Sequence, residues 1–201
     1  MLPAFSKILE KIVYIRLSDH FLSNNLICSS QYGFLSGKST GDAVQNIVQN
    51  FYDAFDRGEF AVGVFLDLRK AFDSLDRRKL LMKLSRYGVD HSSVEWFRSY
   101  FENRRQFVSF GETRSELLNV PYGTPQGGIL GPLLFIIYIN DIIKSSDILK
   151  FVMYADDTNV YSMSSDLDYC IEQLTGSRYI CSMDYCMQRK IVGPFQTVTL
   201  K

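Results

Sequence analysis

The sequence predicts an α+β fold in which an antiparallel sheet holds two acidic segments and helices pack around it. Residues 60–68, FAVGVFLDL, are a continuous apolar stretch of strand length. Such a stretch predicts a central strand that is buried on both faces and ends at Asp67. Residues 151–161, FVMYADDTNVY, predict two strands joined by a tight turn that carries adjacent aspartates. Because helical spacing of apolar residues occurs elsewhere in the chain, a mixed fold is favoured over an all-β one.

The first helix is predicted over residues 2–17, LPAFSKILEKIVYIRL. Pro3 suits a helix start. Apolar residues recur at steps of three and four and therefore share one helical face. They are Phe5, Ile8, Leu9, Ile12 and Ile15.

The second helix is predicted to begin at a capping box and to end before Gly58. Ser39 and Asp42 have the spacing in which each side chain bonds the other residue's backbone N–H. The apolar positions of this helix are Val44, Ile47, Val48, Phe51 and Phe55.

The other predicted elements are four helices and one hairpin. The helices are expected over residues 77–87, 92–102, 129–139 and 166–189. The hairpin is expected over residues 105–120, with its turn at Gly111–Thr113. The tail from Ile191 has no clear assignment.

The composition allows one sizeable core, or one large and one smaller lobe. The chain has 201 residues, of which 46% are hydrophobic. Lys+Arg and Asp+Glu both number 22, so the formal net charge is zero. Nucleic-acid-binding proteins are usually basic, so this balance counts mildly against such a partner. It does not exclude one, because acidic residues in a metal site can mask a basic surface elsewhere.

The cysteines do not indicate a zinc site. They are Cys28, Cys170, Cys181 and Cys186, they include no CxxC pair, and the two histidines, His20 and His91, lie far from them in sequence. We expect reduced thiols in an intracellular protein. The N-terminus lacks the pattern of a signal peptide. The longest apolar run, residues 129–139, is too short to span a bilayer, so we expect a buried helix and no membrane partner.

Three carboxylates are the candidate catalytic group. If the two acidic strands are neighbours, Asp67 converges with Asp156 and Asp157. Such a cluster suits Mg²⁺, which prefers oxygen ligands, with substrate phosphates completing its coordination. Two such ions would activate a nucleophilic hydroxyl and stabilise a leaving oxygen. The alternative is a polar hairpin turn, in which Asp is common.

Two other features have simpler explanations than catalysis. Asp73 is better explained as the cap of the following helix than as a metal ligand. A metal-binding role is not favoured for Asp76 either. The stretch GFLSGKST is not a phosphate-binding P-loop, because Tyr32 stands where the motif needs its first glycine. Lys38 in this stretch contacts a phosphate or RNA backbone, or is a solvated loop lysine.

The order of four motifs is more specific than any one of them. The chain contains QYGF, FLDLRKAFDSLD, GTPQGGILGPLLFIIYINDI and FVMYADDTNVY, preceded by LPAFSKILEKI. Over residues 2–170 it resembles the reverse transcriptase domain of non-LTR (LINE-type, jockey-like) retrotransposons. The resemblance implies a right-hand polymerase palm with partial fingers and no thumb. It assigns residues 1–58 to the fingers, 59–190 to the palm and 191–201 to a divergent tail.

The resemblance also implies RNA-templated DNA synthesis with an RNA template, a DNA primer, dNTPs and Mg²⁺, for which Mn²⁺ can substitute. The implied metal ligands are the carboxylates of Asp67, Asp156 and Asp157 and the backbone carbonyl of Leu68. The implied nucleotide-binding residues are Phe72, Gln126 and Gly127. Phe72 would be a steric gate under the sugar, and its position is also compatible with a core residue. Tyr154 would lie near the primer end. Basic residues that line the duplex or lie on a solvated surface are Lys38, Arg69, Lys70, Arg77, Arg78, Lys79, Arg104 and Arg105.

Several departures from the family pattern bear on activity. Gly128 stands where the family usually has Ser, and Leu35 where it often has Arg. The arginine of an RPI segment that precedes LPxxSKIxE in relatives is not found, so we expect a chain truncated at both ends. The alternative to a polymerase is an inactive retroelement relic or a nucleic-acid-binding module. A nucleotide cyclase is disfavoured by the PQG loop, and a group II intron maturase is a closer rival. The resemblance implies a cytoplasmic ribonucleoprotein that acts in the nucleus, and the oligomeric state is not predicted.

Overall fold

The structure is a computed structural model that describes residues 4–68, 70–175 and 196–200. Its helices are α1 (Ala4–Ser23), α2 (Thr40–Asp56), α3 (Ala71–Ser74), α4 (Arg77–Arg86), α5 (His91–Phe101), α6 (Gly131–Ile139), the 3₁₀ turn η1 (Ile142–Ser145) and α7 (Leu167–Thr175). Its strands are β1 (Phe60–Asp67), β2 (Arg105–Gln106), β3 (Ser109–Phe110), β4 (Thr113–Arg114), β5 (Leu118–Asn119), β6 (Lys150–Tyr154), β7 (Asp157–Ser164) and β8 (Gln196–Leu200). The mixed α+β class predicted from the sequence is therefore confirmed.

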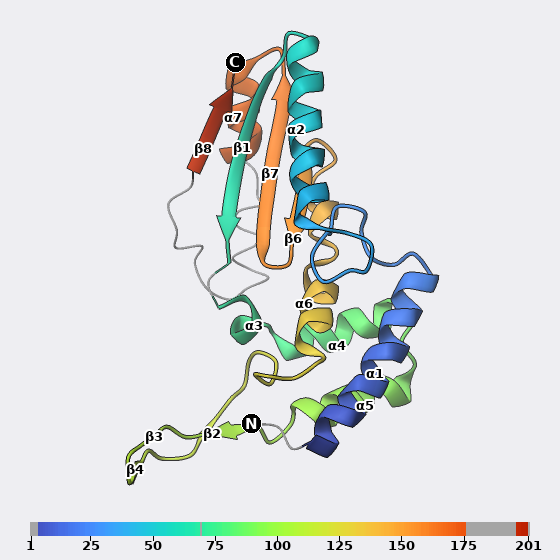
Figure 1. Ribbon diagram of the computed structural model, residues 1–201, viewed down its shortest axis with the longest axis vertical. Helices are drawn as coiled ribbons and strands as arrows, with labels where there is room; N and C mark the ends of the chain where they lie inside the picture. The colour runs from blue at the N-terminus through green and yellow to red at the C-terminus, as the bar shows by residue number, and fades with distance from the viewer. Residues whose placement is uncertain (1–3, 69, 176–195, 201) are drawn as a thin grey trace.

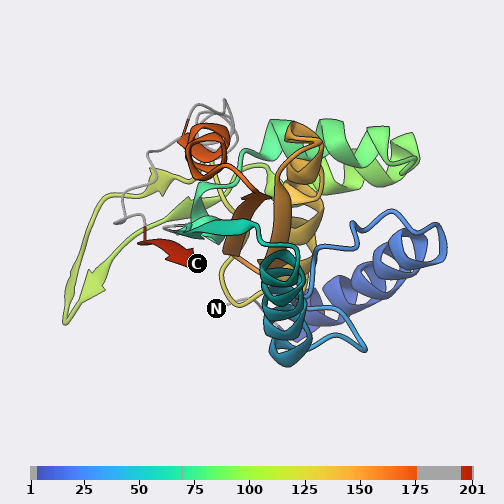
Figure 2. The same ribbon diagram turned by 90° about the horizontal axis from the view of Figure 1, so that it is seen from above.

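The molecule is elongated, with a sheet at one end and a group of helices at the other. The sheet has the order β6-β7-β1-β8, and each neighbouring pair is antiparallel. Figure 1 shows α1, α4 and α5 beyond one end of the sheet, with α6 between them and the strands. The hairpin of β2–β5 extends away from this body, as Figure 2 shows from above.

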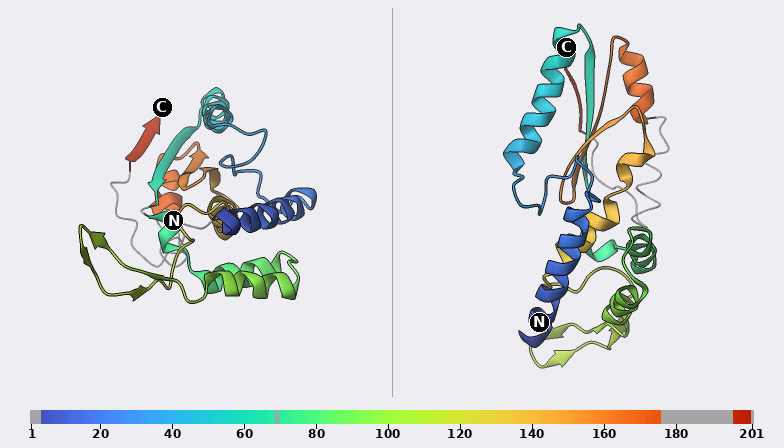
Figure 3. Two further views of the ribbon diagram at one scale, coloured as in Figure 1. Left: turned by 60° about the horizontal axis from the view of Figure 1, so that its bottom comes forward. Right: turned by 90° about the vertical axis from the view of Figure 1, so that its right-hand side faces the viewer.

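The sheet is covered by helices on both faces. Figure 3 shows α2 on one face and α7 on the other. On the α2 face, Val152 and Tyr161 form a small core with Ala43. On the opposite face, Val62 and Val64 belong to the main core that α4, α5, α6 and α7 also fill. This burial on two faces explains the continuous apolar sequence of β1, in which Phe65 is the exception at 40% exposed.

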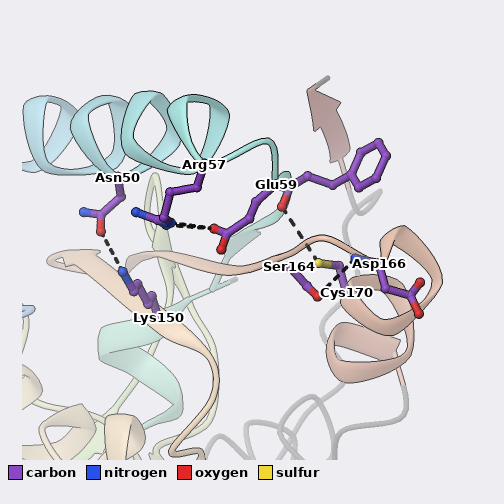
Figure 4. Close-up of polar contacts among 8 residues, drawn as sticks. Asn50, Arg57, Glu59, Lys150, Ser164, Asp166 and Cys170 are labelled. Atoms are coloured by element: carbon purple, nitrogen blue, oxygen red, sulfur yellow. Dashed lines mark hydrogen bonds and ion pairs between the residues drawn. The ribbon is translucent and has the colours of Figure 1, made fainter.

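Polar contacts fix these covering helices at the end of the sheet where β1 begins. Lys150 Nζ on β6 donates to Asn50 Oδ1 on α2 over 2.8 Å. The thiol of Cys170 on α7 donates to the Phe60 carbonyl oxygen over 3.9 Å. Figure 4 shows both contacts: the first joins α2 to β6, and the second joins α7 to the start of β1.

The predicted helices agree with the structure to within about two residues at most of their ends. The capping box of α2 is confirmed, because Asp42 N donates to Ser39 Oγ over 3.2 Å and Ser39 N donates to Asp42 Oδ2 over 2.7 Å. The predicted helix 166–189 begins as α7, and its part beyond residue 175 lies outside the described residues. β8 adds an edge strand in the tail that the sequence left unassigned.

One capping prediction is wrong. Asp76, not Asp73, caps α4, since its Oδ1 accepts from Arg78 N over 2.9 Å and Lys79 N over 3.2 Å. Asp73 lies inside the short helix α3, so it is too early in the chain to reach those N–H groups.

Helix α1 forms as predicted, but its apolar stripe is not the face that packs. The exposed fractions of the stripe are Phe5 82%, Ile8 58%, Leu9 59%, Ile12 47% and Ile15 56%. The buried residues are Glu10, Leu17 and Phe21. Within the described ranges, no helix has both the length and the apolarity needed to cross a membrane.

Candidate active site

The acidic residues of β1 and β7 meet where the sheet faces the helical end of the molecule. Asp67, the last residue of β1, is directly opposite Asp157, the first residue of β7. Residues opposite each other in an antiparallel pair have β-carbons about 4.5–5.5 Å apart. Asp156 lies in the turn that joins β6 to β7, one residue before Asp157. Figure 1 shows this turn beside the end of β1. The structure therefore brings the backbone positions of the three predicted aspartates to the same end of the sheet.

The turn that carries Asp156 is held by the QYGF segment. Ala155 in this turn has φ +58°, a conformation that costs a residue with a β-carbon. The buried Gln31 accepts the backbone N–H of Ala155 at Oε1 over 3.2 Å and that of Gly33 over 2.8 Å. Tyr32 N also donates to the Met153 carbonyl over 2.8 Å, so the segment pairs with β6.

Gly33 lies directly against this turn. A β-carbon at position 33 would be 2.1 Å from the backbone nitrogen of Ala155. Only glycine allows this approach. Gln31 and Gly33 were not predicted as supports of the site, because QYGF pointed in the sequence only to the resemblance. The available signal was a glycine, Gly33, close to an amide side chain, Gln31. The sequence did not show that both contact the distant turn at Ala155.

The site is electronegative. Partial burial raises the pKa of the Asp157 carboxyl, and the nearby charges of Asp156 and Asp67 raise it further. In the part of the chain that the structure describes, none of these three carboxylates has a hydrogen bond or an ion pair. Within the described residues, the repulsion among them is therefore uncompensated.

The three carboxylates fit a divalent cation by their chemistry and their position on the backbone. Oxygen donors are what Mg²⁺ prefers. Over residues 4–68, 70–175 and 196–200, however, no group of three acidic, histidine or cysteine side chains converges as a metal-binding cluster. The backbone thus places the donors side by side, while their carboxylate groups do not point to one centre.

Leu68 follows the acidic strand and is buried. Its carbonyl oxygen accepts a hydrogen bond from Ala71 N over 3.2 Å. A carbonyl oxygen has two lone pairs, so one remains for a further partner. The metal-facing role of this carbonyl stays a prediction.

Phe72 lies at the edge of the main core. Its ring contacts Phe135 with centroids 5.0 Å apart and Phe34 at 6.4 Å. The side chain is half-buried, which agrees with both sequence-based interpretations, a core residue and a gate beneath a sugar.

The loop that contains Gln126 and Gly127 packs beside the segment that contains Phe72. Thr124 N donates to the Phe72 carbonyl over 3.0 Å. Gln126 Nε2 donates to Asp73 Oδ1 over 3.2 Å. Gly127 has φ +75° and open space around its Cα. The structure therefore brings the predicted nucleotide-binding residues together.

The basic residues have more varied positions. Lys38 Nζ donates to the carbonyls of Ser29 over 2.8 Å and Gln31 over 2.6 Å. Its ammonium is thus already bound to the loop that supports the acidic turn. Arg104 donates to the Tyr100 carbonyl over 3.0 Å, whereas Arg105 on β2 is exposed.

Arg77 has a structural role, which contradicts its assignment to a duplex-lining surface. Its guanidinium donates to the carbonyl oxygens of Phe101, Val120, Tyr122 and Gly123. These bonds occupy four of the five N–H donors of the guanidinium. Arg69 lies outside the described residues, and Tyr154 is half-buried and directly opposite Asp157 in the ladder.

Comparison with known proteins agrees with the resemblance. The chain is similar to a probable RNA-directed DNA polymerase from transposon BS of Drosophila melanogaster, with 31% identity over 98% of this chain and 22% of that protein. It is similar to the RNA-directed DNA polymerase from mobile element jockey of the same species, with 30% identity over 83% of this chain and 19% of that protein. A probable RNA-directed DNA polymerase from transposon X-element is 32% identical over 71% of this chain and 16% of that protein. The chain therefore spans less than a quarter of the length of these relatives.

The fold is also found among solved structures. Apo telomerase from Candida tropicalis matches with a TM-score of 0.68 and 13% identity, over 96% of this chain and 37% of that one. The same telomerase in complex with a TWJ fragment of telomeric RNA matches with a TM-score of 0.67 and 13% identity, over 96% of this chain and 35% of that one. At this identity the likeness concerns the fold, and it confirms the predicted palm-like architecture. Residues 1–177 match the family described as reverse transcriptase (RNA-dependent DNA polymerase). The chain belongs to the reverse transcriptase family.

Proposed function

We propose that this chain contributes the polymerase centre of an RNA-directed DNA polymerase, which adds dNTPs to a DNA primer on an RNA template. The observation that carries the proposal is the pairing of Asp67 with Asp157, beside Asp156. Among the described residues, no basic side chain forms an ion pair with these three carboxylates. The choice of an RNA template is supported by the similarity to RNA-directed DNA polymerases of transposon BS and mobile element jockey.

The reaction is an in-line phosphoryl transfer. The primer 3′-oxygen forms a bond to the α-phosphorus of the dNTP, the bond to pyrophosphate breaks, and the hydroxyl proton is lost. Mg²⁺, or Mn²⁺ in its place, would be held by Asp67, Asp156, Asp157 and the Leu68 carbonyl, and would supply activation of the hydroxyl and stabilisation of the leaving oxygen. The protein's own contribution is to hold these donors on a rigid ladder.

The remaining site residues bind and orient the substrates. Phe72 underlies the sugar and disfavours a 2′-hydroxyl by steric clash, while Gln126 and Gly127 pack beside the nucleotide. Tyr154 lies near the primer end. Exposed Arg105 is available to backbone phosphates, which would make binding salt-sensitive. We assign residues 1–58 to the fingers and 59–190 to the palm.

The test is primer extension on an RNA template with the 201-residue chain, dNTPs and Mg²⁺. Asp67→Asn and Asp156→Asn should each reduce extension by about a thousandfold, since several kcal/mol of transition-state stabilisation depend on metal binding. Asp147→Asn is the matched control, because Asp147 is exposed in a loop away from the ladder. Extension that survives Asp156→Asn in a folded chain would contradict the proposal.

A second candidate is nucleic-acid binding without turnover. It is favoured by the finding that the carboxylate side chains do not converge within the described residues. Salt-sensitive binding of a primer–template by a wild-type chain that shows no extension would support this candidate over the first.

A further inference from the structure

Glu10 is a buried acid in a helix whose apolar stripe faces outward. Only 2% of its surface is exposed. Carboxylates are rarely buried to this degree without partners, because they lose their hydration. Within the described ranges Glu10 forms no ion pair. Its burial therefore depends on neutral hydrogen-bond donors.

Those donors come from two distant segments. Glu10 Oε1 accepts the hydroxyl of Tyr100 on α5 over 2.8 Å. Glu10 Oε2 accepts the backbone N–H of Ile129 over 2.5 Å. One side chain thus links α1, α5 and the loop that precedes α6. Hydrogen bonds to a charged acceptor are stronger than neutral ones.

The bond to Ile129 fixes the second end of the loop that holds Gln126 and Gly127. The first end is fixed by two hydrogen bonds: Thr124 N donates to the Phe72 carbonyl, and Gln126 Nε2 donates to Asp73 Oδ1. Between these attachments, Gly127 has no neighbour within 4 Å of an added β-carbon. The middle of the loop is therefore open, and its position depends on the two attached ends.

Gly128 makes room for the carboxylate. A β-carbon at position 128 would be 2.9 Å from Glu10 Oε2 and 3.1 Å from the Pro125 carbonyl oxygen. A side chain at position 128 would therefore have to fit beside the Glu10 carboxylate and the Pro125 carbonyl oxygen.

We propose that Glu10 is a positioning residue, which holds residues 125–129 in the conformation that receives a deoxynucleoside triphosphate. This inference rests on the proposed function, because that function supplies the nucleotide. It adds that the N-terminal helix controls nucleotide affinity through one buried carboxylate. Loss of the carboxylate should raise the KM for dNTP and change kcat much less.

The experiment compares Glu10→Gln, Tyr100→Phe and the control Glu102→Gln, which changes an exposed acid at the end of α5. The first readout is hydrogen exchange at the Ile129 N–H in the free chain, measured by NMR. Glu10→Gln should speed this exchange by about 10- to 100-fold, because a charge-assisted bond becomes a neutral one or is lost. Tyr100→Phe should speed it by a smaller factor, about threefold, because the Glu10–Ile129 bond remains. The control should leave it unchanged.

The second readout is primer-extension kinetics with dNTP as the varied substrate. For Glu10→Gln we expect KM to rise about tenfold and kcat to stay within about threefold. A loss of kcat with unchanged KM would overturn the positioning role. Unchanged exchange at Ile129 in both variants would overturn it without reference to activity. If Glu10→Gln fails to fold, Tyr100→Phe decides the question by the same two readouts. If the wild-type chain shows no extension, the proposed function fails, while the exchange result still decides whether Glu10 holds the loop.

Discussion

The acidic turn and the loop over residues 120–130 are both assigned to the polymerase centre, but the chain holds them in different ways. The turn joins two paired strands and packs closely against backbone atoms, with one buried side-chain contact, the Gln31 Oε1 that accepts the Ala155 N–H. Asp157 pairs with Asp67 in the ladder, and Gly33 approaches Ala155 too closely for any side chain. The loop also has backbone bonds, such as that of Thr124 N to the Phe72 carbonyl. In addition it depends on three side chains from far along the sequence, those of Glu10, Asp73 and Arg77.

Because of this difference, the turn and the loop should be sensitive to different kinds of substitution. A turn packed against backbone responds to added volume, because backbone atoms cannot move away cheaply. A loop held by polar side chains responds to the loss of a donor or acceptor, because its buried partner is left unsatisfied. Substitutions that add volume at the turn, and substitutions that remove a hydrogen-bond partner at the loop, therefore test this difference.

The largest effect is expected from Gly33→Ala. Its β-carbon would lie 2.1 Å from Ala155 N, so the acidic turn must move. We expect a loss of about 3 kcal/mol in the free energy of unfolding, at the upper end for overpacking. Urea unfolding measures it. Gly41→Ala is the control, because its β-carbon would be 3.4 Å from Ser39 Oγ in a helix, where alanine stabilises by about 0.5–1 kcal/mol. Equal stability of the two variants would show that the turn is not packed against QYGF.

A somewhat smaller effect is expected from Arg77→Ala, which removes the donors of four backbone carbonyls at once. Because the guanidinium is half-buried, we expect a loss of about 2 kcal/mol. Arg77→Lys should recover only part of it, since an ammonium cannot reproduce the planar fork of donors.

Thermal or urea unfolding measures the Arg77 variants against Arg86→Ala, an exposed arginine on the same helix. Full recovery by lysine would mean that charge alone, and not the directed hydrogen bonds, holds residues 120–123.

The same comparison explains what the sequence could and could not predict. β1 and the strands beside the turn were predictable, because apolar runs and local turn residues determine them and the ladder follows. The packed face of α1 was not, since the exposed stripe from Phe5 to Ile15 has the stronger periodicity and buried Glu10 looks like a surface residue. The structural role of Arg77 was not predictable for the same reason, since the sequence left it as either a duplex-lining or a solvated surface residue. The carbonyls that accept hydrogen bonds from Arg77 lie 24–46 residues away in the sequence, and no local pattern predicts these contacts.

Asp73 was expected to cap the following helix, but Asp76 is the residue that caps it. Asp76→Ala should cost about 1 kcal/mol, because α4 loses its N-cap. Asp73→Ala should cost less in stability, since Asp73 is exposed and caps nothing, but it releases Gln126 from the loop's first attachment. Urea unfolding separates the two variants. A larger loss from Asp73→Ala would show that the loop contributes more to stability than the cap.

The smallest effect is a pH dependence that arises in the acidic turn. The pKa of Asp157 is raised above its ordinary value of 3.8 in the folded chain, by burial and by its acidic neighbours. The folded state therefore binds this proton more tightly than the unfolded state does. The resulting stabilisation is fully present below pH 3.8 and is lost as the pH rises through the raised pKa. Without divalent cations, wild-type stability should therefore lose this contribution above about pH 4.

Asp156→Asn removes one cause of that raised pKa and should make the loss with rising pH smaller. Carboxyls with lowered pKa values, such as Asp42 beside Ser39, have the opposite slope, so only the difference between the two chains reports on the turn. Urea midpoints measured from pH 3.5 to 6.5 in chelator give this difference, with Asp147→Asn as the control. If Asp156→Asn and wild type have the same slope, the carboxylates do not interact in solution, and the turn is a polar hairpin like any other. If the slopes differ and added Mg²⁺ abolishes the difference, the repulsion is what a bound cation would relieve. The ladder that fixes Asp67 against Asp157 would then store, in the free chain, the interaction energy that metal binding releases.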